Sequence, residues 1–243
     1  MVPVSVLNPN GSAPLVLTCE HASWAVPAEY DDLGLQPEQL QEHIGWDIGV
    51  HGLAEALAER CDATAILAGV SRLIIDCNRD LSDHDLIVAE SDGVVIPGNS
   101  RIDDEERARR VRDFYDPYHQ AVDEVLKQRA EPLLLSLHSF TPVFKGSERR
   151  FDVGVLFDTC AALARQLAQA LAQQGLRVRH NEPYSGLDGL IFSARKHGLK
   201  HGLCYLELEI NNALLRTSPV IKKIAAIVAP SLSAQIESLA HSR

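Results

Sequence analysis

Two histidines and a glutamate lie at the ends of apolar segments that are far apart in the sequence. His21 ends the run Leu-Thr-Cys-Glu-His, His138 ends Leu-Ser-Leu-His, and Glu209 lies in Tyr-Leu-Glu-Leu-Glu-Ile. In an open α/β sheet, ligand sites form at the carboxyl edge of the strands, where the connecting loops line a crevice. Either histidine alone would be an ordinary buried side chain. Both together, with a carboxylate arriving at the same edge, predict a metal-assisted hydrolase.

A third metal ligand is expected beside the two histidines, because catalytic zinc usually has three protein ligands and one open position for water. Asp47, in the segment His-Ile-Gly-Trp-Asp, is predicted to supply it from the start of a long helix. Judged on its local sequence alone, Asp47 is better explained as a helix N-cap. The competing ligands in the same part of the chain are Glu20, His43 and His51. Spacing alone does not decide between these alternatives.

A general base and an anion-binding group are also predicted. Glu207 and Glu209 alternate along one strand and therefore share a face, where buried carboxylates are expensive unless they have a function. The alternative is an edge strand that exposes this face to solvent. Arg79 follows the predicted strand 73–76 and can bind a carboxylate through two hydrogen bonds. The alternative for Arg79 is a structural ion pair with Asp76 or Asp80.

Composition and charge exclude several classes of function. The 243-residue chain carries a formal net charge of −10, which disfavours nucleic acid and anionic membranes as partners, because both require a basic face. A small anionic substrate needs only a local Arg or Lys. The five cysteines show no pairing pattern, and Cys19, Cys77 and Cys204 are interpreted as small core residues. The start of the sequence does not resemble a signal peptide and no apolar run approaches a membrane span, so we expect a cytoplasmic protein.

The elements that must position these residues alternate between strand-like and helical patterns. Strands are predicted at 13–19, 63–67, 73–76, 132–137, 152–157, 176–180 and 203–210. Helices are predicted at 38–60, at 102–129 with a break near Pro117, at 159–174, and at 218–239 with a possible kink at Pro230. This order predicts one α/β domain over 1–243, with a mostly parallel central sheet and helices on both faces. The stretch 82–100 is interpreted as a long loop, which is often functional in compact domains.

Nine short motifs, in order along the chain, resemble the N-formylglutamate amidohydrolase family. The matching segments are Cys-Glu-His-Ala-Ser (19–23), His-Ile-Gly-Trp-Asp (43–47), Ser-Arg-Leu-Ile-Ile-Asp-Cys-Asn-Arg (71–79), Ser-Asp-Gly (91–93) with Ile-Pro-Gly-Asn (96–99), Pro-Tyr-His (117–119), Leu-His-Ser (137–139), Asn-Glu-Pro-Tyr-Ser-Gly (181–186), His-Gly (197–198) and Leu-Glu-Ile-Asn-Asn (208–212). The resemblance covers residues 15–216. It implies a fold like that of the zinc-dependent exopeptidases and cell-wall amidases.

The resemblance also implies roles for individual residues. His21, Asp47 and His138 match the metal ligands, which settles the choice left open by spacing, and Glu209 matches the catalytic strand glutamate. The substrate contacts implied are Asn78, Arg79, Tyr184 and His197. We therefore expect one Zn²⁺ per chain and the hydrolysis of a small anionic N-acyl amino acid. In the family's named activity, N-formyl-L-glutamate yields formate and L-glutamate at the end of histidine degradation.

Two other functions remain compatible with the sequence. One is an enzyme like N-acetylmuramoyl-L-alanine amidase, which the expected cytoplasmic location and the lack of a wall-binding repeat disfavour. The other is a non-catalytic small-molecule-binding protein of the same fold, which the complete set of His21, Asp47, His138 and Glu209 disfavours. The sequence makes no prediction of the oligomeric state.

Overall fold

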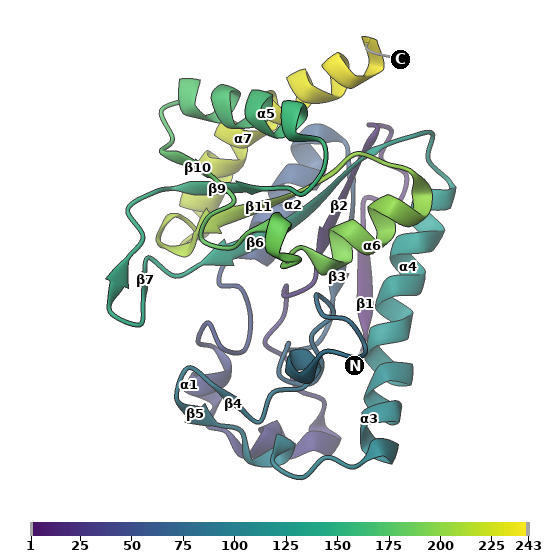
Figure 1. Cartoon of the computed structure of the whole chain (residues 1–243), viewed down its shortest axis with the longest axis vertical. Coiled ribbons are helices and arrows are strands. Elements are labelled where there is room, and N and C mark those ends of the chain that lie inside the picture. The colour runs from purple at the N-terminus through teal and green to yellow at the C-terminus, as the bar shows by residue number, and fades with distance from the viewer. Residues whose placement is uncertain (1, 242–243) are drawn as a thin grey trace.

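A seven-stranded mixed sheet forms the centre of the computed structural model, which describes residues 2–241 (Figure 1). Its strand order is β1-β3-β2-β6-β11-β9-β10. These strands are β1 (Val4–Leu7), β2 (Leu15–Cys19), β3 (Thr64–Ala68), β6 (Leu133–Phe140), β9 (Val153–Leu156), β10 (Val178–His180) and β11 (Tyr205–Asn211). Two small hairpins lie outside this sheet, β4 (Glu90–Ser91) with β5 (Val94–Val95) and β7 (Val143–Phe144) with β8 (Ser147–Glu148).

The middle of the sheet is parallel, as predicted. Strands β3, β2, β6 and β11 run in the same direction, whereas β1 pairs antiparallel with β3 and β9 pairs antiparallel with β11. Every residue of β2 is buried, and so is every residue of β11. Continuous burial is the mark of strands covered on both faces. The sequence prediction of a mostly parallel α/β sheet is therefore confirmed.

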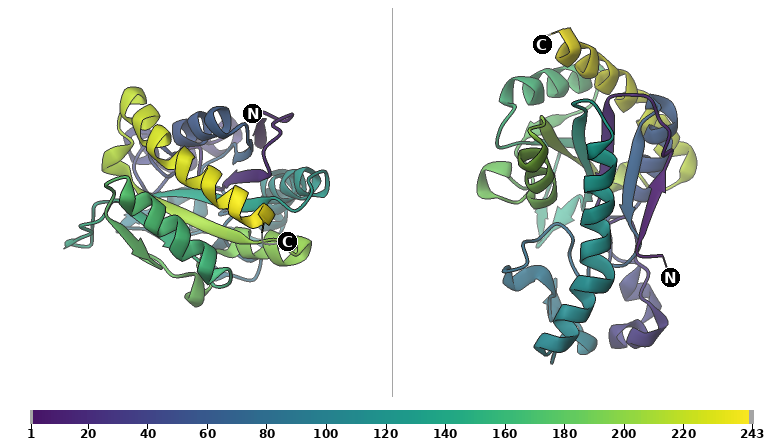
Figure 2. Two further views of the ribbon diagram at one scale, coloured as in Figure 1. Left: turned by 90° about the horizontal axis from the view of Figure 1, so that it is seen from above. Right: turned by 90° about the vertical axis from the view of Figure 1, so that its right-hand side faces the viewer.

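Helices cover the two faces of the sheet (Figure 2). One face carries α2 (Val50–Cys61), α5 (Ala161–Gln173) and α7 (Ser218–His241), and the other carries α4 (Asp116–Lys127) and α6 (Phe192–His201). Each layer encloses its own cluster of buried apolar side chains. Within residues 2–241, no helix combines the length and the apolar character needed to cross a membrane.

The segments that leave the carboxyl ends of β2 and β3 build a separate layer at one end of the sheet, the lower part of Figure 1. This layer contains the short helices η1 (Ala28–Gly34), α1 (Pro37–Leu40), η2 (His84–Leu86) and η3 (Pro97–Asn99), the β4–β5 hairpin and the start of α3 (Asp104–Arg110). The remaining short helices are η4 (Val111–Tyr115), η5 (Gly186–Asp188) and η6 (Asn212–Leu214). The long loop predicted at 82–100 falls in this layer, with short elements of its own.

Several predicted elements differ from the observed ones. The helix expected at 38–60 is two helices, α1 and α2, because Gly45 and Gly49 lie in the connection between them. Gly49 has φ +81°, and a Cβ there would lie 2.4 Å from the carbonyl oxygen of Leu215. The strand expected at 73–76 is a turn, and β1 and both hairpins were not predicted. The helix at 102–129 does not break at Pro117; it passes through a π-helical turn, η4, instead.

The interpretation of Cys204 as a core residue is also wrong. Cys204 forms a disulfide with Cys160, although 44 positions separate them in the sequence. The fold brings the start of α5 beside the start of β11, with the two Cα atoms 6.0 Å apart. Cys19, Cys61 and Cys77 are free, and Cys19 and Cys77 are buried as expected.

A buried arginine joins the layer at the carboxyl end of the strands to the long helix formed by α3, η4 and α4 (the α3–α4 helix). Arg110 is 2% exposed and donates hydrogen bonds to the Ile74 carbonyl oxygen at 3.0 Å and to Asn99 Oδ1 at 2.8 Å. Its Nε donates to Glu106 Oε1 at 2.8 Å. Asn99 in turn donates to the Leu73 carbonyl oxygen at 2.8 Å. These bonds fix the turn at residues 73–76 in place of a strand.

We expect Arg110→Met to lower the free energy of unfolding by about 2–4 kcal/mol, because it leaves buried acceptors on Ile74 and Asn99 without a donor. Urea unfolding followed by circular dichroism measures this loss. The control is Arg112→Met on the same helix, where the side chain is exposed and the expected change is within about 0.5 kcal/mol. Equal effects of the two substitutions would contradict the anchoring role of Arg110.

Candidate metal centre

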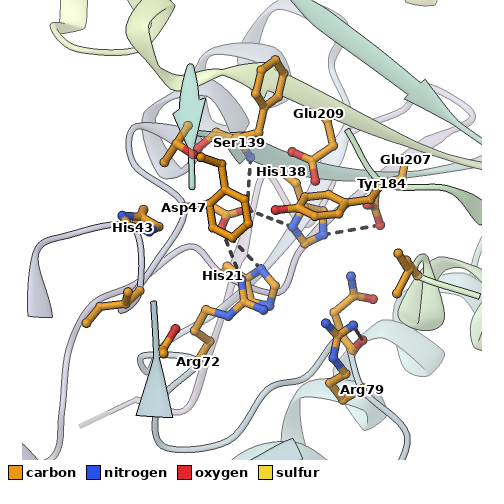
Figure 3. Close-up of a pocket in the computed structure, with 17 residues that line it drawn as sticks. His21, His43, Asp47, Arg72, Arg79, His138, Ser139, Tyr184, Glu207 and Glu209 are labelled. Atoms are coloured by element: carbon orange, nitrogen blue, oxygen red, sulfur yellow. Dashed lines mark hydrogen bonds and ion pairs between the residues drawn. The ribbon is translucent and has the colours of Figure 1, made fainter. Parts of the chain in front are cut away.

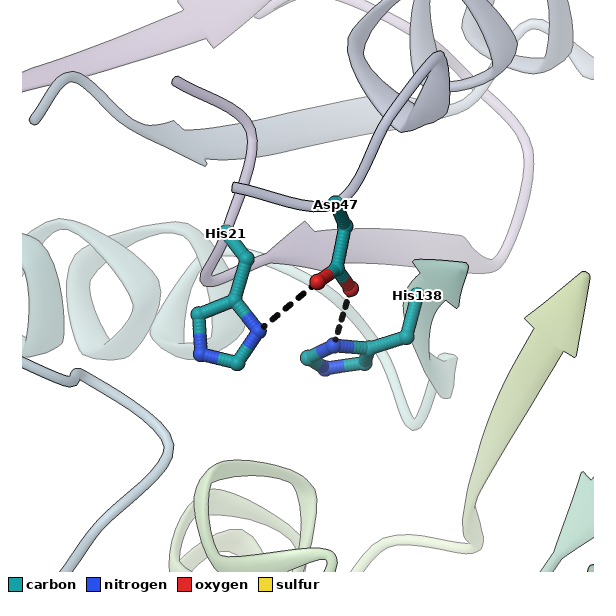
Figure 4. Close-up of side chains that lie close together, drawn as sticks. All are labelled: His21, Asp47 and His138. Carbon is teal, nitrogen blue, oxygen red and sulfur yellow. Dashed lines mark hydrogen bonds and ion pairs between the residues drawn. The ribbon is translucent and has the colours of Figure 1, made fainter. Parts of the chain in front are cut away.

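Three side chains from separate segments meet at the carboxyl edge of the sheet (Figure 4). His21 follows β2, His138 lies near the end of β6, and Asp47 lies in the connection between α1 and α2. Asp47 Oδ2 is 2.9 Å from His138 Nδ1, and Asp47 Oδ1 is 3.5 Å from His21 Nδ1. The two imidazole rings lie edge to face with centroids 4.8 Å apart. The three residues predicted as metal ligands therefore converge.

Asp47 is held by the backbone on both sides of the site. Its N–H donates to the His21 carbonyl oxygen at 3.0 Å, and its Oδ2 accepts a hydrogen bond from the Ser139 N–H at 3.0 Å. The alternative of a helix N-cap is not observed, because the N-cap of α2 is Gly49. Asp47 is 6% exposed. Its carboxylate is thus fixed between the two histidines instead of serving the helix.

The far side of each histidine ring is bonded to a second carboxylate. His21 Nε2 is 2.8 Å from Asp76 Oδ1, and His138 Nε2 is 3.0 Å from Glu20 Oε2. A carboxylate on one ring nitrogen fixes the proton there and leaves the other nitrogen as a metal ligand. Both rings therefore present Nδ1 to the space beside Asp47. His21 Nδ1 is buried and makes no hydrogen bond within residues 2–241.

This geometry fits a divalent cation. The ligand atoms of His21, Asp47 and His138 all lie within 4.8 Å of one another. Two imidazoles with one carboxylate form a three-ligand set of the kind that holds a catalytic metal and leaves a position open. Burial alone would lower the pKa of His138, but the surrounding carboxylates, Glu207 foremost, raise it well above its ordinary value. The electrostatic field at this ring therefore stabilises positive charge.

Glu20 lies outside the group of three and supports the His138 ring. Its Oε2 accepts from the Ser136 hydroxyl at 2.7 Å, and its Oε1 accepts from the Tyr118 hydroxyl at 2.7 Å. Burial opposes ionisation, yet the bonds from His138 and from the two hydroxyls hold the pKa of Glu20 well below its usual range. Asp76 is likewise kept ionised against the effect of burial, by Arg72 and His21, which lower its pKa. Both supporting carboxylates therefore carry a full charge.

A cavity of about 210 Å³ opens over the two histidines and Asp47 (Figure 3). Its apolar wall is formed by Ile44, Phe140, Phe144, Tyr184 and Leu190. Its polar lining includes Arg72, Asn78, Arg79, Ser139, Thr141, Glu207 and Glu209. A cavity of this size, with a few convergent polar groups, suits one small molecule.

Glu207 and Glu209 lie on a central strand and not on an edge, so the alternative of a solvated face is wrong. β11 is hydrogen-bonded to β6 on one side and to β9 on the other, and Glu209 is paired in register with His138. Glu207 and Glu209 are 2% and 4% exposed, and one oxygen of each has no hydrogen-bond partner within residues 2–241. Burial raises the pKa of both carboxyls, although His138 opposes the rise. A carboxylate with a raised pKa is a stronger proton acceptor.

The arginines of the cavity differ in how far they are neutralised. Arg72 donates to Asp76 Oδ2 at 2.5 Å. Arg79 has a looser partner, with its Nε 3.9 Å from Asp83 Oδ2. The expected ion pair of Arg79 with Asp76 or Asp80 is thus replaced by a weak one with Asp83. Arg79 does line the cavity as predicted, although it follows a turn and not a strand.

Other residues considered from the sequence separate into three groups. Asn78 and Tyr184, predicted as substrate contacts, line the cavity. His43 lines its outer part and is bonded to Asp92 Oδ2 at 3.1 Å, away from the histidine pair. His51 is exposed on α2 and pairs with Glu55.

His197 does not line the cavity, and its predicted contact with the substrate needs correction. It is fully buried between α4 and α6, where its Nε2 is 2.8 Å from His119 Nδ1 and its Nδ1 is 3.0 Å from Asp123 Oδ1. His201 and Lys200 bond the same aspartate. The His-Gly motif placed this residue in the family pattern, but only the packing of the two helices shows which way the ring points.

Sequence reasoning missed the supporting role of Asp76 and, apart from Tyr184, the aromatic wall. The sequence did contain a signal for Asp76, because this acidic residue lies between two arginines, Arg72 and Arg79. Phe140, Phe144 and Thr141 had none, because they come from the end of β6 and the β7–β8 hairpin. These short segments carry no periodic pattern.

Comparisons with known proteins show the family and the fold. A family model described as N-formylglutamate amidohydrolase matches residues 13–216. The solved structure of the gene product Atu2144 from Agrobacterium tumefaciens is 33% identical, with a TM-score of 0.93, over 98% of this chain and 96% of that chain. An N-formylglutamate amidohydrolase from Ralstonia eutropha JMP134 is similar in fold, at 21% identity and a TM-score of 0.75 over the full length of both chains. No curated protein sequence matches at a significant level.

We expect Glu20→Gln to weaken divalent-metal affinity by roughly 10- to 100-fold, because the amide no longer holds the His138 ring as a charged acceptor. Competition with a fluorescent chelator measures the affinity independently of any activity. His138→Ala, which removes a ligand, should abolish binding, whereas the exposed Glu29→Gln should leave it unchanged. Wild-type affinity in Glu20→Gln would show that the bond between Glu20 and His138 does not support the metal.

Proposed function

Because the chain belongs to the N-formylglutamate amidohydrolase family, we propose that it is a zinc-dependent hydrolase of small N-acyl amino acids, with N-formyl-L-glutamate as the substrate of choice. Family membership supports amide hydrolysis in general; the metal and the substrate are the proposed parts. The observation that carries the proposal is the group of His21, Asp47 and His138 at the floor of a cavity that also contains buried carboxylates. The products would be formate and L-glutamate.

Each part of the site has a task in this reaction. His21 Nδ1, Asp47 and His138 Nδ1 would hold the zinc ion. Zinc in such a site supplies a Lewis acid that polarises a carbonyl group and lowers the pKa of water. Asp76 and Glu20 keep the two rings oriented, and Arg79 binds a carboxylate of the substrate at the cavity wall. Arg79 cannot be exchanged for lysine without loss, because an ammonium group lacks the planar fork of donors.

We assign the general base to Glu209. Its carboxylate takes a proton from the attacking water and passes it to the amide nitrogen as the C–N bond breaks, so that the amino acid leaves as an amine. The register that pairs Glu209 with His138 supports this choice over Glu207, which lies two residues earlier and faces the rear of the same ring. Glu207 Oε2 is 3.5 Å from His138 Nε2, on the side where Glu20 is bonded.

The proposed function is tested by metal content and by turnover. We expect about one zinc per purified chain, measured by inductively coupled plasma mass spectrometry. We expect formate release from N-formyl-L-glutamate, followed with a coupled dehydrogenase, and its loss on chelation with recovery on adding zinc. Metal binding without turnover of any N-formyl, N-acetyl or N-succinyl amino acid would favour the binding-protein alternative.

Glu209→Gln should retain zinc and lose kcat by roughly 10²–10⁴-fold, the usual contribution of a general base. Glu207→Gln replaces a second buried carboxyl of the same strand by an amide and is the matched control. It should lower kcat less than Glu209→Gln does. Steady-state kinetics with zinc content measured for each variant compares them. A larger loss of kcat in Glu207→Gln than in Glu209→Gln would assign the general base to Glu207 and reject the assignment to Glu209.

A further inference from the structure

A second guanidinium group, that of Arg149, lies against the aromatic wall of the cavity, and no carboxylate of the described residues neutralises it. Arg149 follows β8 and is half-buried. Its guanidinium carbon lies 4.9 Å from the centroid of the Phe144 ring, 5.3 Å from that of Tyr184 and 5.8 Å from that of Phe140. All three rings line the cavity. The guanidinium group of Arg149 therefore packs against the aromatic wall.

The bonds of Arg149 leave most of its donors free. Its NH1 donates a long hydrogen bond of 3.5 Å to the carbonyl oxygen of Thr141, another cavity residue. Within the part of the chain that the structure describes, Arg149 forms no ion pair with a carboxylate. Arg72, in contrast, is neutralised by Asp76 at 2.5 Å. Arg149 thus retains its charge at the wall of the cavity.

The neighbouring Arg150 shows that this placement is specific to one of two adjacent arginines. The Arg150 side chain is 82% exposed, and its Nε pairs with Glu148 Oε2 at 2.6 Å. Arg149 and Arg150 both border a neighbouring hollow and neither lines the cavity itself, but the guanidinium group of Arg149 contacts rings of the cavity wall. Consecutive residues of an extended segment point to opposite sides, so one arginine faces the aromatic wall and the other faces solvent.

The charge of Arg149 reaches the reacting groups. Burial raises the pKa of Glu209, and the positive charges of His138 and then Arg149 act against that rise. Flanking aromatic rings hold a guanidinium by cation–π attraction and leave its in-plane N–H groups available for a carboxylate. Arg79 in the lining and Arg149 behind the aromatic rings are thus two guanidinium groups, on different segments, that could each meet an anion.

We propose that Arg149 is a specificity-determining residue that binds the side-chain carboxylate of the substrate, an inference that rests on the proposed function. Arg79 then binds the α-carboxylate. Arg79 lies three residues after Asp76, and the Arg79 N–H donates to the Asp76 carbonyl oxygen at 3.2 Å. Asp76 is bonded to His21, so Arg79 lies beside the residues proposed to bind the metal. The α-carboxylate is the anion nearer to the scissile amide, whereas the side-chain carboxylate extends toward the rim, where the β7–β8 hairpin ends.

The test compares N-formyl-L-glutamate with N-formyl-L-glutamine, which has nearly the same shape and lacks the side-chain charge. We expect the wild-type enzyme to prefer the glutamate compound. Arg149→Met should lower kcat/KM for it by roughly 10- to 100-fold and leave the glutamine compound within about 3-fold. Arg149→Lys should restore part of the preference, since it restores charge without the fork. Arg150→Met is the matched control and should change neither substrate.

Arg79→Met provides the opposite pattern, because loss of the α-carboxylate contact should slow both substrates alike. Circular dichroism and zinc content check that each variant is folded and loaded, and competitive inhibition by L-glutamate against L-glutamine repeats the comparison without turnover.

Equal losses on both substrates in Arg149→Met and Arg149→Lys would make Arg149 a structural part of the wall and overturn the inference. The inference would also be overturned if the wild-type enzyme hydrolysed neutral N-formyl amino acids as well as it hydrolyses N-formyl-L-glutamate. The proposed function would stand in that case. Failure to hydrolyse any N-acyl amino acid would reject the function and the inference together.

Discussion

Buried negative charge is the constraint on which the rest of the site depends. Five carboxyl groups surround the two histidines with at most 6% exposure each: Glu20, Asp47, Asp76, Glu207 and Glu209. An ionised carboxylate without a partner is costly in a protein interior. Glu20, Asp47 and Asp76 stay ionised because imidazole, hydroxyl and guanidinium groups contact them, whereas burial raises the pKa of Glu207 and Glu209. A site with this excess of acid favours a cation, and the nearby histidine nitrogens are suited to bind one.

The fold supplies the rigidity that this arrangement requires. His138 is part of a central strand, and β11 beside it carries both glutamates in register. Asp47 is on a loop, but a loop fixed by hydrogen bonds to the carbonyl oxygen of His21 and the N–H of Ser139. Arg110 ties the segment that carries Asp76 to the α3–α4 helix. The site therefore combines side chains from strands with side chains from loops that the backbone immobilises, an arrangement that suits precise metal geometry.

Charge is distributed unevenly between the floor and the wall of the cavity. The floor is acidic, and the chain as a whole carries a net charge of −10, which would repel an anionic substrate at long range. Two guanidinium groups, that of Arg79 in the lining and that of Arg149 against the aromatic rings, add positive charge locally. One of them, Arg149, is held by aromatic rings and not by a carboxylate, so that its charge is available to a ligand. This division is what the proposed binding of a metal ion and an anion in one small cavity requires.

The sequence by itself determined the mostly parallel sheet and the helices on its faces, and with the family motifs it predicted the group of His21, Asp47 and His138. These features depend on local patterns, namely continuous apolar strands and short motifs at strand ends, and the observed convergence of His21, Asp47 and His138 agrees with them. Local patterns failed at residues 73–76, where β-branched and apolar residues suggested a strand. There the bonds of Arg110 and Asn99 to the backbone carbonyls, made by residues 25 or more positions away, favour a turn.

Only the tertiary structure decided which groups face the site. It placed His197 between two helices and away from the cavity, paired Cys160 with Cys204, and showed that β11 is central and its glutamates are buried. It also gave Glu20 and Asp76 their supporting roles and brought Arg149 to the aromatic wall. In each case the contact joins segments that are distant in the sequence. The direction of a side chain then depends on the packing of two elements against each other, and the periodicity of either element alone does not contain that information.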